Sequence, residues 1–451
     1  MRTAGLIAVA QNMEMRIDIK GGLNLRFEGA PEQTLLGRVV SDTVAVQLQD
    51  YRGLQPKLQV ASGDRVLVGQ PLLQDRGRPE LVATAPVAGT VKSINRGARR
   101  RLSQIILQAD GAESVPFPTF DSRQIDGLGA AKVREALQQS GLWLALRARP
   151  FDCVASPAIQ PRALFITAID SNPLAADPAV VIEARREEFI AGVSALAQLP
   201  SGNTYVCLAP DTNIPLPQNA RVQRAEFGGP HPAGLPGTHL HATGLEVRRE
   251  PDLWHVGYQD VIAFGSLLLR GQLDGERVIA LAGPGVENPG LMQVRLGSAL
   301  SALPVPHKEM DKQVIAGPLL GLAKKADYLG RFDLQVSVFP AGASVRKSGG
   351  IWRNAALRLL ATPRTSESLP PVVRPHAGML PVEVFERVWP YRTSPAALLR
   401  AVLIGDPDDA VQLGCLGLAE EDLALCNLVC PSGQDYAGAL RRTLERIEQQ
   451  L

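Results

Sequence analysis

The stretch that decides the fold reads Ser140-Gly-Leu-Trp-Leu-Ala-Leu-Arg-Ala-Arg-Pro-Phe151, and after nine residues Pro161-Arg-Ala-Leu-Phe-Ile-Thr-Ala-Ile-Asp-Ser-Asn-Pro173. Within it, residues 163–169 form an almost unbroken apolar run that ends at the breakers Asp170 and Pro173. A strand that is buried on both faces of a parallel sheet requires such a run. We therefore predict that these residues form the central strand of an α/β domain.

The next segment predicts a helix and a second strand. Asp177-Pro178 supplies an N-cap and a proline in the first helical turn, and apolar residues then recur on one helical face until residues 200–203 end the pattern. Residues 204–208 are typical of the following strand. In such a unit a ligand binds at the carboxyl ends of the strands.

The predicted ligand site therefore comprises the turn at 170–173 and the approach loop at 141–151. A nucleotide or flavin phosphate needs glycines that let backbone N–H groups come close. This loop carries Trp143, Arg147 and Arg149 instead. The pattern does not favour a bound dinucleotide or flavin.

Length and composition limit the classes of protein to which the chain can belong. The 451 residues exceed one domain, and 47 basic against 45 acidic residues give no bulk electrostatic case for nucleic acid as a partner. Five cysteines, an odd number over a long chain, argue against a disulfide framework. The longest apolar runs fall short of a membrane span, so a membrane role must be peripheral. We expect residues 1–14 to form a tail, and the sequence leaves Met1, Met13 and Met15 open as the site where translation starts.

Residues 15–114 are predicted to form a β-rich domain. Short alternating runs surround Gly-Asp and Ala-Gly turns, as hairpin strands require, and the segment resembles the biotinyl/lipoyl barrel-sandwich fold. Carrier members of that fold modify a lysine at a hairpin tip. The corresponding tip, residues 75–80, contains no lysine, so we expect a packing or docking barrel.

Residues 115–256 form the predicted Rossmann-like α/β domain, which ends in a loop at residues 227–241. The loop carries His231, His239 and His241, but no carboxylate or thiol is interleaved at ligand spacing. We expect a structural or pocket-lining loop and no metal. Residues 257–330 follow with a helix and two strands, and their order resembles a β-grasp, soluble-ligand-binding domain. A docking surface for another protein remains an equal interpretation of that domain.

Residues 331–451 begin with a strand and then become mainly helical. Cys426, Cys430 and Pro431 match only the last part of a ferredoxin-type cluster motif, because the two earlier ligand positions are Glu420 and Leu423. Two thiolates cannot hold a cubane cluster. We expect a helical domain that has lost an iron–sulfur site.

The assembled pattern is similar to one family. A barrel, an α/β domain without phosphate-binding glycines, a β-grasp domain and a cluster domain that lacks half its ligands resemble, in this order, the complex I flavin subunit and the C subunit of the Rnf complex. More closely, the chain resembles the A-subunit family of the sodium-translocating NADH:quinone reductases. The motifs that carry this resemblance are residues 20–33, 140–151, 169–175, 231–235, 257–261, 327–331 and 413–431.

The resemblance implies a peripheral subunit on the cytoplasmic face of the bacterial inner membrane. There, with five other subunits, it would serve a complex that oxidises NADH, reduces ubiquinone and exports sodium ions. It implies that this chain holds no redox cofactor and no metal, while NAD, flavins and iron–sulfur centres belong to partner subunits. No residue of this chain is expected to catalyse a reaction independently.

The candidate quinone-binding residues are Trp143, Arg147, Arg149, Phe151 and His231. An apolar slot with donors aimed at the carbonyl oxygens would suit a quinone ring. The alternative for these bulky residues is that they plug a disused pocket. For the whole chain, the alternatives are an NADH-oxidising flavin or iron–sulfur subunit and a purely structural scaffold.

Overall fold

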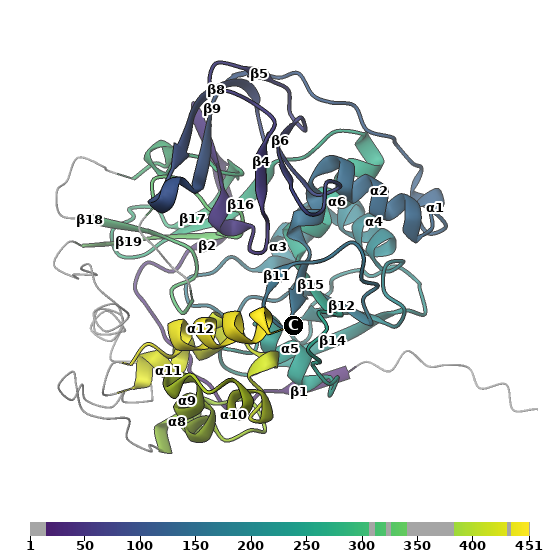
Figure 1. Cartoon of the computed structure of the whole chain (residues 1–451). Coiled ribbons are helices and arrows are strands. Elements are labelled where there is room, and N and C mark those ends of the chain that lie inside the picture. Colours follow the sequence, from purple (N-terminus) through teal and green to yellow (C-terminus); the bar gives the residue numbers. More distant parts are fainter. Residues whose placement is uncertain (1–14, 306–311, 322–325, 341–382, 431–433, 451) are drawn as a thin grey trace, which may run out of the picture.

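A computed structural model describes residues 15–305, 312–321, 326–340, 383–430 and 434–450 (Figure 1). These residues form a seven-stranded sheet, a five-stranded sheet, an N-terminal barrel of two smaller sheets, and a group of C-terminal helices. The predicted tail at 1–14 lies outside the described residues. No helix in the described ranges is both long and apolar enough to cross a membrane.

The seven-stranded sheet has the order β1-β14-β13-β12-β15-β10-β11. The predicted strand at 163–169 is confirmed as the central strand β12, which pairs in parallel with β13 on one side and β15 on the other. Its side chains are almost all buried, as its apolar sequence requires. The strands are β1 (Met15–Asp18), β10 (Arg147–Arg149), β11 (Cys153–Val154), β12 (Ala163–Ala168), β13 (Thr204–Leu208), β14 (Val222–Gly228) and β15 (Leu253–Gly257).

Helices cover this sheet. Asp177 caps the predicted helix by accepting a hydrogen bond from the Ala179 N–H. The helix does not continue as one piece, because Arg185 leaves the helical region with φ −134° and ψ 38°. The helices are α1 (Ser122–Ile125), α2 (Ala130–Ser140), α3 (Pro178–Ala184), α4 (Arg186–Leu196), α5 (Pro236–Ala242) and α6 (Tyr258–Arg270).

The prediction that residues 227–241 form a loop is wrong at both ends. The first two residues complete β14, and Pro236 begins the helix α5, which carries His239 and His241. Proline suits the first helical turn because its missing N–H is not needed there. Because this segment is rich in proline and glycine, its short helix was not predicted from the sequence.

The N-terminal barrel is confirmed as two facing sheets, with strand orders β3-β9-β8-β5 and β4-β6-β7. The tip without a lysine is a compact turn, in which the Asp75 carboxylate accepts hydrogen bonds from the backbone of Gln55, Gly77 and Arg78. The strands are β3 (Thr43–Gln47), β4 (Pro56–Leu58), β5 (Arg65–Val66), β6 (Pro71–Asp75), β7 (Val82–Thr84), β8 (Ala88–Arg96) and β9 (Leu102–Gly111).

The five-stranded sheet has the order β18-β19-β16-β17-β2 and draws its strands from three predicted domains. Its edge strand β2 comes from the predicted barrel segment, and β19 comes from the predicted helical segment. Likewise, β1 of the barrel segment pairs with β14. Rossmann-like and β-grasp remain predictions for the two large sheets. The strands are β2 (Glu32–Arg38), β16 (Glu276–Ala282), β17 (Gly290–Arg295), β18 (Lys312–Ala316) and β19 (Gln335–Pro340).

The C-terminal helices form a separate layer beside the seven-stranded sheet (Figure 1). Their core contains the aromatic pair Phe385 and Tyr436, and it extends to Phe151 of the approach loop. A 3-10 turn at Glu420–Leu423 leads directly into α11. The helices are α8 (Glu383–Val388), α9 (Pro395–Ile404), α10 (Pro407–Gln412), α11 (Ala424–Val429) and α12 (Tyr436–Gln449).

Candidate functional site

A cavity of about 210 Å³ opens where the parallel strands β12 and β15 end. We call it the central pocket. It lies at the turn after β12, where sequence reasoning placed a ligand site, because loops at the carboxyl ends of parallel strands leave a crevice. Its lining residues are Ala145, Arg147, Asp152, Thr167, Ile169, Asp170, Asn172, Gly234, Pro236, His255, Val256, Gly257, Tyr258, Gln259, Asp260, Arg277, Arg331, Phe332, Leu334, Ala419, Glu420 and Glu421.

Arginines and one aromatic ring dominate one wall of the central pocket. The guanidinium carbons of Arg147 and Arg331 lie 4.9 and 5.9 Å from the centre of the Phe332 ring, within cation–π range. Asp260 accepts hydrogen bonds from Arg277 at 2.6 Å and from Arg331 at 2.8 Å. One carboxylate thus pairs with two buried guanidinium groups on this wall.

Three buried polar atoms of the lining residues have no hydrogen-bond partner among the described residues. They are Thr167 Oγ1, Asn172 Oδ1 and Arg331 Nε. Buried polar atoms are satisfied in the great majority of cases, so a cluster of exceptions calls for an explanation. All three are closed off from the cavity in this structure, so a bound molecule would reach them only after neighbouring side chains moved.

One backbone amide at the turn and one in the facing segment are already engaged. The Asn172 N–H donates to the Asp170 carboxylate at 2.8 Å, and the Gly234 N–H donates to Ser171 Oγ at 2.8 Å. Phosphate binding at the end of a strand depends on free N–H groups. These two N–H groups are therefore not available to a phosphate in this structure.

Several titratable groups at the pocket have shifted pKa values. Burial lowers the pKa of His255, whose Nε2 donates to Asp152 Oδ1 at 2.9 Å. Burial would raise the pKa of Asp152, but Arg147 and Arg149 outweigh it and hold that pKa well below its usual range. Burial raises the pKa of Asp170 and, with the neighbouring Asp422 charge, that of Glu421. The pocket therefore combines fixed carboxylates with carboxyls that retain protons more readily.

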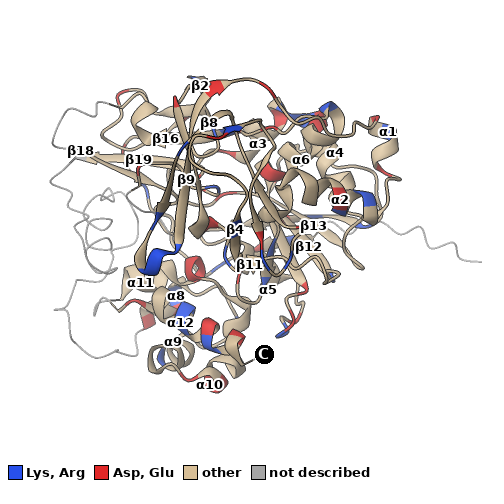
Figure 2. Ribbon diagram, turned by 45° about the horizontal axis from the view of Figure 1, so that its top comes forward, with Lys and Arg blue, Asp and Glu red and all other residues tan. Residues whose placement is uncertain are grey.

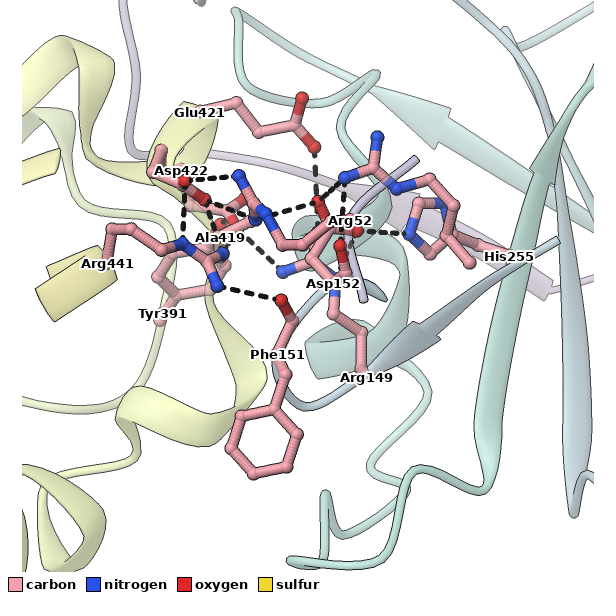
Figure 3. Close-up of polar contacts among 12 residues, drawn as sticks. Arg52, Arg149, Phe151, Asp152, His255, Tyr391, Ala419, Glu421, Asp422 and Arg441 are labelled. Atoms are coloured by element: carbon pink, nitrogen blue, oxygen red, sulfur yellow. Dashed lines mark hydrogen bonds and ion pairs between the residues drawn. The ribbon is translucent and has the colours of Figure 1, made fainter. Parts of the chain in front are cut away.

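Behind the pocket, an ion-pair network joins the barrel, the sheet and the C-terminal helices (Figure 3). Glu420 binds Arg52 of the barrel at 2.8 Å and Arg441 of α12 at 2.8 Å. Arg149 is fully buried and lies 3.7 Å from Asp152, 3.5 Å from Glu421 and 3.4 Å from Asp422. The network holds three regions of the chain in one arrangement.

Because of Glu420, the free energy of unfolding is expected to decrease at acid pH. Burial would raise its pKa, but Arg441 and Arg52 together lower it to about 2, below the value of about 4.3 for an unfolded chain. Its contribution of roughly 3 kcal/mol is therefore present above pH 4.3 and is lost as pH falls towards 2. We expect the difference in unfolding free energy between wild type and Glu420→Gln to shrink between neutral pH and about pH 3.

The control is Glu183→Gln on α3, whose side chain is 61% exposed. Its effect on unfolding free energy should remain small and similar at both pH values. A Glu420→Gln difference that stayed constant on acidification would contradict the expectation.

The structure places the five candidate quinone-binding residues in different surroundings. Only Arg147 lines the central pocket. Trp143 is fully buried, donates from its indole N–H to the Ala155 carbonyl, and packs edge-on against Trp254. Its location matches the alternative in which bulky residues fill the interior.

The other three lie behind or beside the pocket. Arg149 belongs to the ion-pair network, and Phe151 packs into the core of the C-terminal helices with a left-handed φ of 68°. His231 is buried, with Nδ1 3.0 Å from Ser171 Oγ and Nε2 without a partner among the described residues. Burial lowers its pKa to about 3, so the ring is neutral.

Several pocket residues were missed from the sequence. Arg331 and Phe332 come from the segment before β19, Asp260 and Arg277 from α6 and β16, and Glu421 from the C-terminal region. A signal for some of them was present, because motif segments at 257–261 and 327–331 include Asp260 and Arg331. Their convergence on one pocket depends on tertiary packing.

The cysteines and histidines give no ligand cluster among the residues described. No group of three or more His, Cys, Asp or Glu side chains there is arranged to hold a metal ion. Cys426 is buried, which raises the pKa of its thiol, and Cys430 Sγ lies 3.3 Å from the Tyr436 hydroxyl. Pro431 of the partial cluster motif lies outside the described residues.

Known proteins match the chain over nearly all of its length. It is 41% identical over 445 residues to the A subunit of Na(+)-translocating NADH-quinone reductase from Pasteurella multocida, covering 96% of this chain and 100% of that one. The proteins of the same name from Yersinia pestis and Haemophilus influenzae are 42% and 40% identical over the same shares. A NAD+-reducing hydrogenase structure is 16% identical over 73% of this chain and 67% of that one, at a TM-score of 0.37, too low to carry an argument.

Family models match two of the regions described above, and together with the fold they define a class. The models are the NqrA N-terminal barrel-sandwich hybrid domain, at 17–110, and the NqrA second alpha/beta domain, at 128–273. The class is a multidomain α/β protein with an N-terminal barrel-sandwich hybrid domain that serves as one subunit of an oxidoreductase complex. The chain belongs to the NqrA family, which comprises the A subunits of Na(+)-translocating NADH-quinone reductase.

Proposed function

We propose that this subunit binds the ubiquinone headgroup in the central pocket and docks on the membrane subunits of its complex. It holds no redox cofactor, and electrons reach the quinone from flavins and iron–sulfur centres in the five partner subunits. The complex oxidises NADH, reduces ubiquinone to ubiquinol and exports sodium ions. The observation that carries this proposal is the cavity at the carboxyl ends of β12 and β15, which is lined by both arginines and apolar side chains of the described residues.

The composition of the pocket supports a quinone ligand. Ile169, Val256 and Leu334 supply apolar surface for the ring, while Arg147 and Arg331 supply donors for the carbonyl oxygens. Such donors would stabilise the negative charge that develops on those oxygens during reduction. The two electrons that form ubiquinol are accompanied by two protons, and the lining carboxyls with raised pKa values suit a role in holding them.

The engaged amides at the turn support the absence of a flavin from this chain. Purified protein is expected to show no absorbance band near 450 nm and no broad iron–sulfur band, because we propose that both chromophores belong to partner subunits. An absorbance spectrum of the isolated chain provides the measurement. Stoichiometric flavin or iron would instead favour an NADH-oxidising subunit.

The proposed location is the cytoplasmic face of the bacterial inner membrane, where membrane subunits hold the chain. A sodium path through the bilayer requires membrane-spanning segments. We therefore assign sodium translocation to partner subunits. Co-purification of the other subunits after membrane extraction would test the docking part of the proposal.

Labelling of the assembled complex with a photoreactive ubiquinone tests the pocket. We expect modification of peptides that line it, particularly those around Arg147 and residues 327–334. An excess of unmodified ubiquinone should suppress the labelling. Modification confined to other subunits, or to α8–α10 of this chain, would remove the central pocket from the pathway.

A further inference from the structure

One end of the barrel concentrates positive charge. The β8–β9 hairpin carries five exposed cations in ten residues and no carboxylate in that stretch: Lys92, Arg96, Arg99, Arg100 and Arg101. The chain as a whole carries only +2, so the remainder is net negative. Figure 2 shows this hairpin end in blue. We call it the basic hairpin tip.

The five cations are not used inside the fold. None of them forms an ion pair with any other residue that the structure describes. The nearest interactions are internal, such as Arg96 Nη1 donating to the Arg100 carbonyl at 3.1 Å. Exposed like charges at neighbouring positions repel one another and contribute nothing to packing. Among the described residues these charges therefore face solvent and are available to a partner.

The backbone of the tip gives a second, independent argument. Arg99 and Arg100 both have positive φ, 54° and 59°, and the Arg101 N–H donates to the Ala98 carbonyl at 3.2 Å. This is a type I′ turn, which strongly favours Asn-Gly because both central residues adopt left-handed conformations. Two arginines occupy the positions where asparagine and glycine would be relaxed. Two arginines in strained turn positions, with no compensating ion pair among the described residues, indicate that these positions serve a function.

We propose that the basic hairpin tip binds the headgroups of anionic phospholipids and orients the subunit on the membrane surface. This inference rests on the peripheral location proposed above. Clustered lysines and arginines are attracted to anionic lipid surfaces, and their contributions accumulate with each cation. Lipid is favoured over an acidic protein patch because residues 92–101 include none of the large exposed hydrophobic side chains that the centre of a protein interface buries.

The test measures co-sedimentation of the full-length chain with vesicles of phosphatidylglycerol and phosphatidylethanolamine. We expect binding at about 0.1 M salt, loss of binding at about 1 M salt, and no binding to neutral phosphatidylcholine vesicles. The double variant Arg99→Asn/Arg100→Gly should bind roughly tenfold or more weakly, because two cations are removed. It should also unfold at a higher temperature, because the turn is relaxed.

The matched control is Arg123→Gln/Arg221→Gln, which removes two exposed cations elsewhere and should bind as wild type does. Equal loss in both double variants, or salt-independent binding, would overturn the proposal. So would a hairpin variant that binds vesicles normally but fails to co-purify with the other subunits, since the tip would then contact protein. Photolabelling of the central pocket is independent of the tip, so failure of either proposal is recognisable separately.

Discussion

Replacing Arg149 by methionine is expected to lower the free energy of unfolding by roughly 3–5 kcal/mol. The guanidinium group is fully buried, and Asp152, Glu421 and Asp422 all lie within 4 Å of it. Burial disfavours the charged guanidinium, yet the three carboxylates raise the pKa of Arg149 above its usual value. Methionine keeps much of the volume but leaves buried carboxylates without their cation. Equilibrium unfolding in urea, followed by circular dichroism, provides the measurement.

The matched control is Arg186→Met on α4, whose ion pair with Glu183 lies on the surface. Its effect should stay within about 0.5 kcal/mol, because exposed pairs contribute little. A loss below about 1 kcal/mol for Arg149→Met would show that the buried carboxylates accept protons or water at little cost. The network would then not hold the three regions together.

Replacing Gly257 by phenylalanine is expected to raise the quinone KM of the assembled complex by tenfold or more. Gly257 lines the central pocket, and a Cβ at this position would meet no atom within 4 Å. Its φ of −78° and ψ of 149° suit any residue, so the ring can enter the pocket without backbone strain. The loss of glycine as the N-cap of α6 should cost only about 0.5–1 kcal/mol of stability.

Gly37 of β2 offers the control, because a Cβ there also meets nothing within 4 Å and the residue does not line the central pocket. Gly37→Phe should leave the quinone KM unchanged. If Gly257→Phe also left the KM unchanged in a stable, fully assembled complex, quinone binding in the central pocket would be excluded. NADH oxidation by an artificial acceptor should continue normally in both variants.

Much of the local structure could be predicted from the sequence. The apolar run at 163–169 predicted the central strand, and Asp177 with Pro178 predicted where the next helix begins. Residues 204–208 form β13 as expected. These features depend on neighbours in sequence, where burial pattern and capping chemistry leave a readable signal.

Sheet membership could not be predicted in the same way. Strands β1 and β2 flank a short irregular segment, yet one joins the seven-stranded sheet and the other joins β17. Nothing in their composition identifies a partner, since parallel pairing is set by distant residues and chain crossovers. Strand β2 lies before the boundary predicted at residue 114, and β19 lies after the boundary predicted at residue 330. Both nevertheless belong to the five-stranded sheet.

The position of the candidate site could be predicted from the sequence, but most of the residues that line it could not. The turn after β12 was expected to form the ligand site, and the pocket lies there. Trp143 was expected at the site because it occurs in the approach loop, but its ring points into the core and contacts Trp254. Side-chain direction in an irregular loop is decided by packing, and the arginines Arg277 and Arg331 arrive from segments far along the chain.

The pairing of β1 with β14 has a consequence for how the chain folds during its synthesis. Met15 lies opposite Ala225, so β1 has no partner in this sheet until more than two hundred further residues have been translated. At roughly 5–20 residues per second, that delay is about 10–40 s. The barrel, whose strands are close in sequence, can fold in that interval, while the nascent N-terminal strand stays unpaired and available to chaperones until the sheet behind it is complete.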